Sequence, residues 1–181
     1  IAAIWVKLGP REPTSPVKFA MGLMDRGATF QANPALQEAF GSEPHRAVAR
    51  EAVRQSLVLL KNDDDTLPLA KETNHIIVAG PAADSVGLQC GGWTIEWLGG
   101  EDNITEGTTL LQALRQTVSA GTRLNYRAAG RFPAGFQADV GIVCLHELPS
   151  AEGVGARPDL NLDGHTIALL PRVRARCRRL V

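Results

Sequence analysis

The sequence predicts an α/β fold built on a mainly parallel sheet. Two short apolar runs, at 75–80 and 138–145, have the composition of strands that are buried on both faces. Segments whose apolar residues recur at helical spacing lie before, between and after these runs. Because alternating strands and helices favour parallel strands joined by helical crossovers, the order of the segments predicts the fold class.

The composition is that of a globular protein and disfavours several other classes. The 181 residues are 44% hydrophobic and 21% charged, which disfavours intrinsic disorder. Lys and Arg together number 19, as do Asp and Glu, and this balance disfavours a dedicated nucleic-acid-binding protein. No apolar run approaches the roughly 20 residues of a membrane-spanning helix. We therefore expect neither nucleic acid nor membrane as a partner.

The first 41 residues are irregular, because proline and glycine interrupt any long periodic run. The start at Ile1 has no initiator Met and no signal-peptide pattern, so we expect a chain that begins inside a longer protein. A helix is expected over 43–55, where Ser42 can cap the start and Pro44 suits the first turn. Residues 57–60 could continue that helix, but their aliphatic run favours a buried strand.

After the strand at 75–80, a glycine-rich loop is expected to extend to about Gly107. Thr108 or Thr109 then caps a helix whose apolar residues fall on one face. These are Leu110, Leu111, Leu114 and Val118. Further elements are expected as a strand over 122–128, a strand over 138–145, a helix over 164–176 and a strand beginning at 178–181.

The loop after Gly80 has an uncommon concentration of tryptophan. Trp93 and Trp97 are two of the three tryptophans of the chain, and they stand between glycine pairs. An indole stacks on the C–H face of a sugar ring, and nearby glycines let a ligand approach the backbone. The alternative is that both indoles pack in the core, and spacing alone does not decide between the two. In a parallel sheet, ligands bind beyond the carboxyl ends of the strands, where this loop and the loop after Leu145 begin.

The loop after Leu145 carries two carboxylates, Glu147 and Glu152. Paired carboxylates perform glycoside hydrolysis, but a separation of five residues in one loop fixes no distance. A solvated or hydrogen-bonding role is therefore favoured over a catalytic one. The His146 side chain is expected to be packed or partly exposed, and not to act as a general base. Cys144 with His146 lacks the second pair that a zinc site needs, so the three cysteines are expected to be free thiols and no metal is expected.

Several longer segments occur in a fixed order. They are HRAVAREAVRQSLVLLKN at 45–62, LPL at 67–69, VAGPAAD at 78–84, QCGGWTIEW at 89–97, GTTLL at 107–111 and the E-x-P-x-x-E-G-x-G loop at 147–155. This ordered set resembles glycoside hydrolase family 3, in its β-glucosidase and exo-β-glucanase branch. The chain departs from the family pattern at four positions: Leu98 for Gln, His146 for Gly, Ser150 for Tyr and Ala156 for Asp.

The resemblance implies a (β/α)8 barrel that supplies an aspartate nucleophile, followed by an α/β sandwich that supplies an acid/base glutamate. The resemblance therefore also implies that the full-length enzyme hydrolyses terminal non-reducing β-D-glucosyl residues with retention of configuration. No cofactor is expected. Residues 1–41 would be the barrel tail and connector, and 42–181 a truncated sandwich. The nucleophile would lie upstream of Ile1 and the acid/base, in a G-S-E-G-Q-G-like segment, downstream of Val181. No catalytic residue is therefore expected in this chain, which alone should be inactive.

The resemblance also implies roles for the tryptophans. Trp97 and Trp93 would line the aglycone side of the substrate pocket and stack on the next sugar of a β-glucoside or β-glucan oligosaccharide. Asp84, Gln89 and Glu96 lie near them without an implied role. The usual location of family members implies that the full-length protein is periplasmic or secreted. The alternative is a non-catalytic carbohydrate-binding or interaction module that reuses the sandwich.

Overall fold

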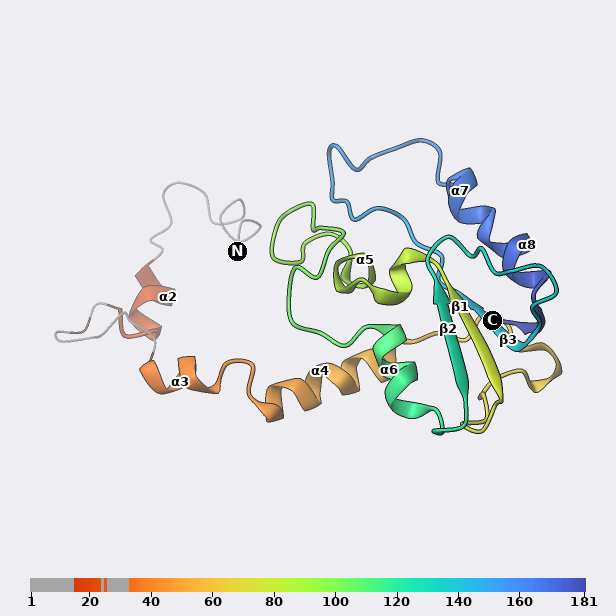
Figure 1. The fold of residues 1–181 in the computed structure, drawn as a ribbon. Coiled ribbons are helices and arrows are strands. Elements are labelled where there is room, and N and C mark those ends of the chain that lie inside the picture. Colours follow the sequence, from red (N-terminus) through yellow and green to blue (C-terminus); the bar gives the residue numbers. More distant parts are fainter. Residues whose placement is uncertain (1–14, 24, 26–32) are drawn as a thin grey trace. The chain divides into compact units, whose positions relative to one another are not determined.

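A computed structural model of the chain describes residues 15–23, 25 and 33–181 (Figure 1). The chain divides into two compact units, Ile1–Leu60 and Lys61–Val181. The expected connector, residues 1–41, lies partly outside the described residues. Within them it contains two short helices, α2 (Ser15–Ala20) and α3 (Pro34–Ala39). The domain boundary expected between residues 41 and 42 stays a prediction.

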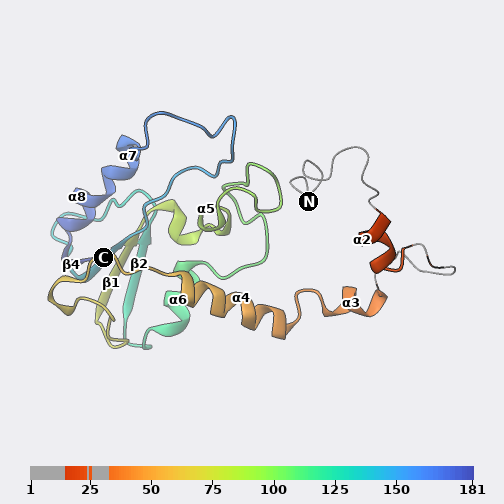
Figure 2. The ribbon, with the colours of Figure 1, turned by 180° about the vertical axis from the view of Figure 1, so that it is seen from behind.

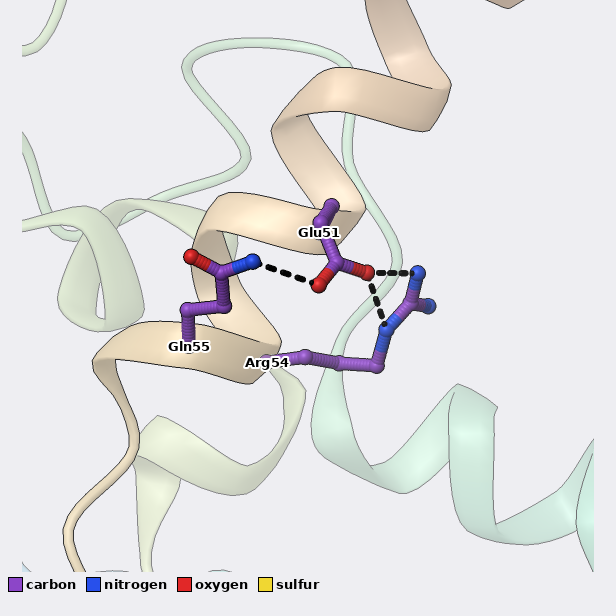
Figure 3. A network of polar contacts seen from close by, with 3 residues as sticks. All are labelled: Glu51, Arg54 and Gln55. Atoms are coloured by element: carbon purple, nitrogen blue, oxygen red, sulfur yellow. Dashed lines mark hydrogen bonds and ion pairs between the residues drawn. The ribbon is translucent and has the colours of Figure 1, made fainter.

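The longest helix of the first unit is α4 (Glu43–Ser56), which confirms the helix expected over 43–55. Ser42 occupies the N-cap position, and its side chain makes no capping hydrogen bond. An exposed polar network holds the last turns (Figure 3): Glu51 accepts from Gln55 Nε2 at 2.8 Å and from Arg54 Nε at 3.0 Å. The bond from Gln55 and that from Arg54 lower the pKa of the Glu51 carboxyl, because both favour its charged form.

The buried strand expected at 57–60 is wrong. Leu57 has extended dihedral angles, φ −68° and ψ 134°, but the segment joins no ladder in the described part of the chain. Its four aliphatic side chains are exposed, to 91% at Leu60. An apolar run becomes a strand only where a neighbouring strand pairs its backbone N–H and C=O groups, and composition does not report that partner.

The second unit is built on a four-stranded, all-parallel sheet in the order β2-β1-β3-β4; Figure 1 labels the first three strands along the chain and Figure 2 labels β4. The strands are β1 (His75–Ala79), β2 (Arg123–Arg127), β3 (Ala138–Val143) and β4 (Cys177–Leu180). The strands expected from the two apolar runs are confirmed as the central pair, and every residue of β1 is buried. The α/β class with a parallel sheet is thus confirmed.

Helices cover both faces of this sheet, as Figures 1 and 2 show. On one face, Ile76 and Val78 pack with Leu111 of helix α6 (Leu110–Thr117). On the other face, Ile77 and Ala79 belong to a second apolar cluster. That cluster includes Leu169 and Val173 of helix α8 (Leu169–Arg174). The alternation of side chains along a strand therefore divides the core into two layers, which is the expected partial sandwich.

The helix expected over 164–176 is instead two short helices, α7 (Gly164–Ile167) and α8, which meet at Ala168. Pro171 explains the division, because proline has no N–H to donate to the carbonyl of Ile167. The glycine-rich loop after β1 also contains short helices, η2 (Pro81–Asp84) and α5 (Val86–Cys90). A further short helix, η1 (Asp63–Asp65), precedes the sheet. No helix in the described ranges is long and apolar enough to cross a membrane.

Helix α6 is fixed at its start by a capping box. The Thr109 hydroxyl accepts from Gln112 N–H at 3.2 Å, and Gln112 Oε1 accepts from Thr109 N–H at 3.1 Å. The same hydroxyl donates to Asp84 Oδ1 at 2.9 Å, which ties the helix to the loop after β1. Thr109, rather than Thr108, is therefore the N-cap.

Two neighbouring leucines of α6 allow a test of which side chain packs in the core against the sheet. Leu111 is fully buried, whereas Leu110, expected on the same face, is 40% exposed. We expect Leu111→Ala to lower the free energy of unfolding by about 2–5 kcal/mol, because it leaves a cavity against the sheet. Leu110→Ala is the matched control and should cost much less. Urea unfolding followed by circular dichroism measures both, and equal losses would contradict the assignment.

Candidate functional site

The two loops with uncommon chemistry leave the sheet side by side. Ala79 of β1 lies opposite Val143 of β3, and Cys144 N–H donates to the Ala79 carbonyl at 2.9 Å. Gly80 has φ +99°, and a Cβ atom there would clash with the Cys144 carbonyl oxygen. Only glycine allows the chain to turn this closely beside the neighbouring strand. The expectation that both loops begin at one edge of the sheet is confirmed.

Further from the sheet, the two loops remain in backbone contact. A Cβ atom placed on Gly92 would clash with the Ser150 carbonyl oxygen, and one on Gly99 would lie 3.1 Å from Pro149 Cβ. The glycine pairs around the tryptophans therefore allow the loop after β1 to pack against the loop after β3. This close packing makes the two loops one surface, which we call the double loop (residues 89–100 and 147–155).

Both tryptophans of the double loop are on the surface. Trp93 is 67% exposed and Trp97 is 47% exposed. Their ring centroids are 6.5 Å apart at an interplanar angle of 60°, and Trp93 N–H donates to the Trp97 carbonyl at 3.0 Å. The alternative that both indoles pack in the core is wrong for this chain. The structure brings two apolar ring faces together where solvent, and hence a ligand, reaches them.

The backbone between the indoles is strained. Trp93 has φ +64° and Ile95 has φ +63°, a region that bulky and β-branched residues rarely adopt. Hydrogen bonds from Glu96 N–H to Thr94 O at 2.7 Å and from Gly99 N–H to Glu96 O at 3.1 Å hold the turn. Strain of this kind concentrates at binding sites, where the surrounding structure maintains it.

The two carboxylates of the double loop have different surroundings. Glu147 forms an ion pair with Arg157, and both side chains are about half exposed. Glu152 is exposed and joins no ion pair in the part of the chain that the structure describes. It precedes Gly153, where a Cβ atom would lie 3.9 Å from Trp97 Cη2. Glu152 is therefore the carboxylate without a cationic partner next to the exposed indole.

Two polar residues near the tryptophans form hydrogen bonds that hold the loop. Gln89 Nε2 donates to the Ala82 carbonyl at 2.6 Å, and Asp84 accepts from Thr109. Ser85, which the sequence did not single out, caps α5 by accepting from Leu88 N–H at 3.0 Å. A serine three residues before the capped N–H is the pattern that could have identified it. The partnership of Arg157 with Glu147 has no comparable pattern, because it depends on how the loop folds back.

The three cysteines are free thiols, as expected. Burial raises the pKa of the Cys144 thiol to about 11, since a buried site disfavours the thiolate. Burial also raises the pKa of Cys177. Among the described residues, no three His, Cys, Asp or Glu side chains lie close enough together to hold a metal ion.

This environment predicts selective alkylation. With its pKa raised to about 11, the Cys144 thiol stays protonated at pH 8, and the thiolate is the form that reacts. We expect iodoacetamide to modify exposed Cys90 and to spare Cys144 and Cys177 in the folded chain. Peptide mass spectrometry after brief labelling checks this. Labelling in urea should modify all three, and rapid labelling of Cys144 without urea would contradict the buried environment.

Known proteins resemble this chain in sequence and in fold. The profile of the family described as "Glycosyl hydrolase family 3 C-terminal domain" matches residues 57–181. A lysosomal beta glucosidase of Dictyostelium discoideum is 27% identical over 175 residues, which cover 87% of this chain and 21% of that protein. A periplasmic beta-glucosidase of Salmonella typhimurium is 38% identical over 85 residues, or 47% of this chain and 10% of that protein.

Solved structures agree with these matches. The exo-1,3/1,4-beta-glucanase of a Pseudoalteromonas species superposes with a TM-score of 0.67 at 35% identity, over 75% of this chain and 17% of that chain. Beta-D-glucoside glucohydrolase of Trichoderma reesei, at 24% identity and a TM-score of 0.56, shares the fold over 77% of this chain and 23% of that chain. The chain thus spans at most about a quarter of the length of these relatives. It belongs to glycosyl hydrolase family 3, and its residues 57–181 lie within the C-terminal domain of that family.

Proposed function

We propose that this chain is part of a retaining β-glucosidase or exo-β-glucanase and contributes the aglycone-side surface of the substrate pocket. The observation that carries the proposal is the double loop itself, in which two exposed indoles lie together and Gly153, next to Trp97, follows Glu152, a carboxylate with no ion pair in the described part of the chain. An N-terminal barrel domain of the same protein would supply the nucleophile. The β-glucosidase and β-glucanase names of the relatives support this substrate class.

The chemistry of the double loop suits a β-linked glucan. In a β-D-glucosyl unit the ring hydroxyls are equatorial, so each ring face presents C–H groups that can pack on an indole. We propose that Trp97, with Trp93 at an angle to it, holds the sugar that follows the scissile bond. The turn that carries the indoles is strained, with positive φ at Trp93 and Ile95.

We further propose Glu152 as the group that protonates the leaving oxygen. A retaining glycosidase needs an acid/base carboxyl group roughly 5–5.5 Å from its nucleophile. Glu147 already shares its charge with Arg157, whereas Glu152 is exposed and adjacent to Trp97 through Gly153. The glutamate expected downstream of Val181 is the competing assignment. The two assignments differ in what the replacement of Glu152 does to catalysis.

Indole fluorescence tests the binding part of the proposal. In the full 181-residue chain with Trp5→Phe, the two tryptophans of the double loop are the only indoles that report. Laminari- or cello-oligosaccharide should quench them in a saturable manner, and Trp97→Ala should abolish saturation while Trp97→Phe retains it. An unchanged titration in Trp97→Ala would contradict the role of Trp97. Binding without hydrolysis by the complete protein would favour a non-catalytic module.

A further inference from the structure

A cavity opens at the same edge of the sheet as the double loop, on the side covered by α7 and α8. Its volume is about 440 Å³, and its lining includes Pro81 after β1, Ala128 and Ala129 after β2, and His146 after β3. In the order β2-β1-β3-β4, the crossovers through α6 and through α7–α8 lie on opposite faces, so the order reverses between β1 and β3. Such a switch point is where open parallel sheets commonly bind ligands.

The charged and polar side chains of this cavity favour an anion. Arg131 and Arg172 both line it, together with the imidazoles of His146 and His165. Within the described ranges neither guanidinium forms an ion pair, and the hydrogen bond from Arg172 Nη1 to the Ala129 carbonyl is long, at 3.4 Å. The Nδ1 atom of His146 is buried and has no hydrogen-bond partner there.

One carboxylate, Asp163, also lines the cavity, and both of its oxygens accept hydrogen bonds from the start of α7. Oδ1 accepts from His165 N–H at 2.8 Å and from Thr166 N–H at 2.9 Å, and Oδ2 accepts from the Thr166 hydroxyl at 2.7 Å. The Thr166 hydroxyl is the largest of the causes that lower the pKa of Asp163. Asp163 therefore caps α7, and it neutralises neither guanidinium by a direct ion pair.

We propose that this cavity binds the oxyanion group of a small molecule, a phosphate or a carboxylate, through Arg131 and Arg172. Guanidinium groups present paired N–H donors that match both kinds of oxyanion. The His146 side chain lines the cavity as well, and its buried Nδ1 has no hydrogen-bond partner among the described residues. The tryptophans are absent from the lining, so this site is separate from the proposed sugar surface and does not depend on it.

Calorimetric titration of the full 181-residue chain tests the proposal. Sodium phosphate and sodium glucuronate are the two probes, at constant ionic strength, with glucose as the uncharged control. We expect saturable binding of at least one anion, tighter than any binding of glucose, which has no oxyanion group. Stronger binding of phosphate would identify a phosphorylated ligand, and stronger binding of glucuronate would identify a carboxylated one.

Three glutamine substitutions locate the site. Arg131→Gln and Arg172→Gln should each weaken binding about tenfold or more, because each removes charge-assisted hydrogen bonds. Arg115→Gln, on α6 across the sheet, removes the same charge without touching the cavity and should change nothing. Thermal unfolding verifies that all three variants fold. Binding of neither anion, binding that survives both cavity substitutions, or an equal loss in Arg115→Gln would overturn the proposal.

Discussion

Replacing Glu152 by Gln in the complete glycosidase is expected to lower kcat on an unactivated β-glucoside by about 10²–10⁴-fold. General acid catalysis contributes a factor of this size, and the amide cannot give a proton to the leaving oxygen. On 2,4-dinitrophenyl β-glucoside, whose leaving phenolate needs no proton, the rate of the first bond cleavage should fall far less. Steady-state and single-turnover kinetics on the two substrates measure the difference.

Glu147→Gln is the matched control for that variant. Glu147 lies on the same loop, but it is paired with Arg157, so its replacement removes a surface ion pair worth about 0–1 kcal/mol. We expect kcat within a few-fold of the parent enzyme. If Glu152→Gln instead behaved like Glu147→Gln on both substrates, the acid/base role would belong to the glutamate expected downstream of Val181.

Gly80→Ala is expected to destabilise the second unit by roughly 3 kcal/mol or more. Alanine at φ +99° is strained, and its methyl group would overlap the Cys144 carbonyl, so β1 and β3 would have to separate at their carboxyl ends. Tyr126 hydroxyl also donates to the Gly80 carbonyl at 3.3 Å, and this contact would be displaced. Chemical unfolding measures the loss, and oligosaccharide titration should show weaker binding of any variant that still folds.

Gly121→Ala provides the control for Gly80→Ala, because a Cβ atom at Gly121 meets open space. Its effect on stability should be within about 0.5 kcal/mol of zero, as for most surface substitutions. If both variants lost the same stability, the close approach of Gly80 to Cys144 would not be what positions the double loop.

The parts of the fold that local pattern determines could be predicted from the sequence. The buried runs at β1 and β3 lie in the middle of the sheet, where burial on both faces leaves a continuous apolar signal. The start of α6 was similarly readable, because Thr109 is part of a local capping pattern. By contrast, the run at 57–60 has the composition of a strand but pairs with no other strand in the described part of the chain. Whether a strand pairs depends on residues that are distant in the sequence, so the run alone could not show it.

The candidate site was predictable in position but not in detail. The rule for parallel sheets placed the loops of Trp97 and Glu152 at one edge, and the structure agrees. Spacing could not decide whether the indoles are buried, because Trp is usually buried whatever its role. Nor could it separate Glu147 from Glu152, since the separation depends on Arg157 folding back onto one of them.

The proposed function depends above all on the stacking of Trp97 on a glucosyl ring at the surface of the double loop. Saturation-transfer NMR of the 181-residue chain with laminaritriose detects this contact directly. Irradiation of the indole protons should transfer magnetisation to the axial hydrogens of one ring face of a single glucosyl unit, and Trp97→Ala should remove the transfer. Absent transfer, equal transfer to both faces, or transfer that survives Trp97→Ala would contradict the stacking of Trp97 on the sugar.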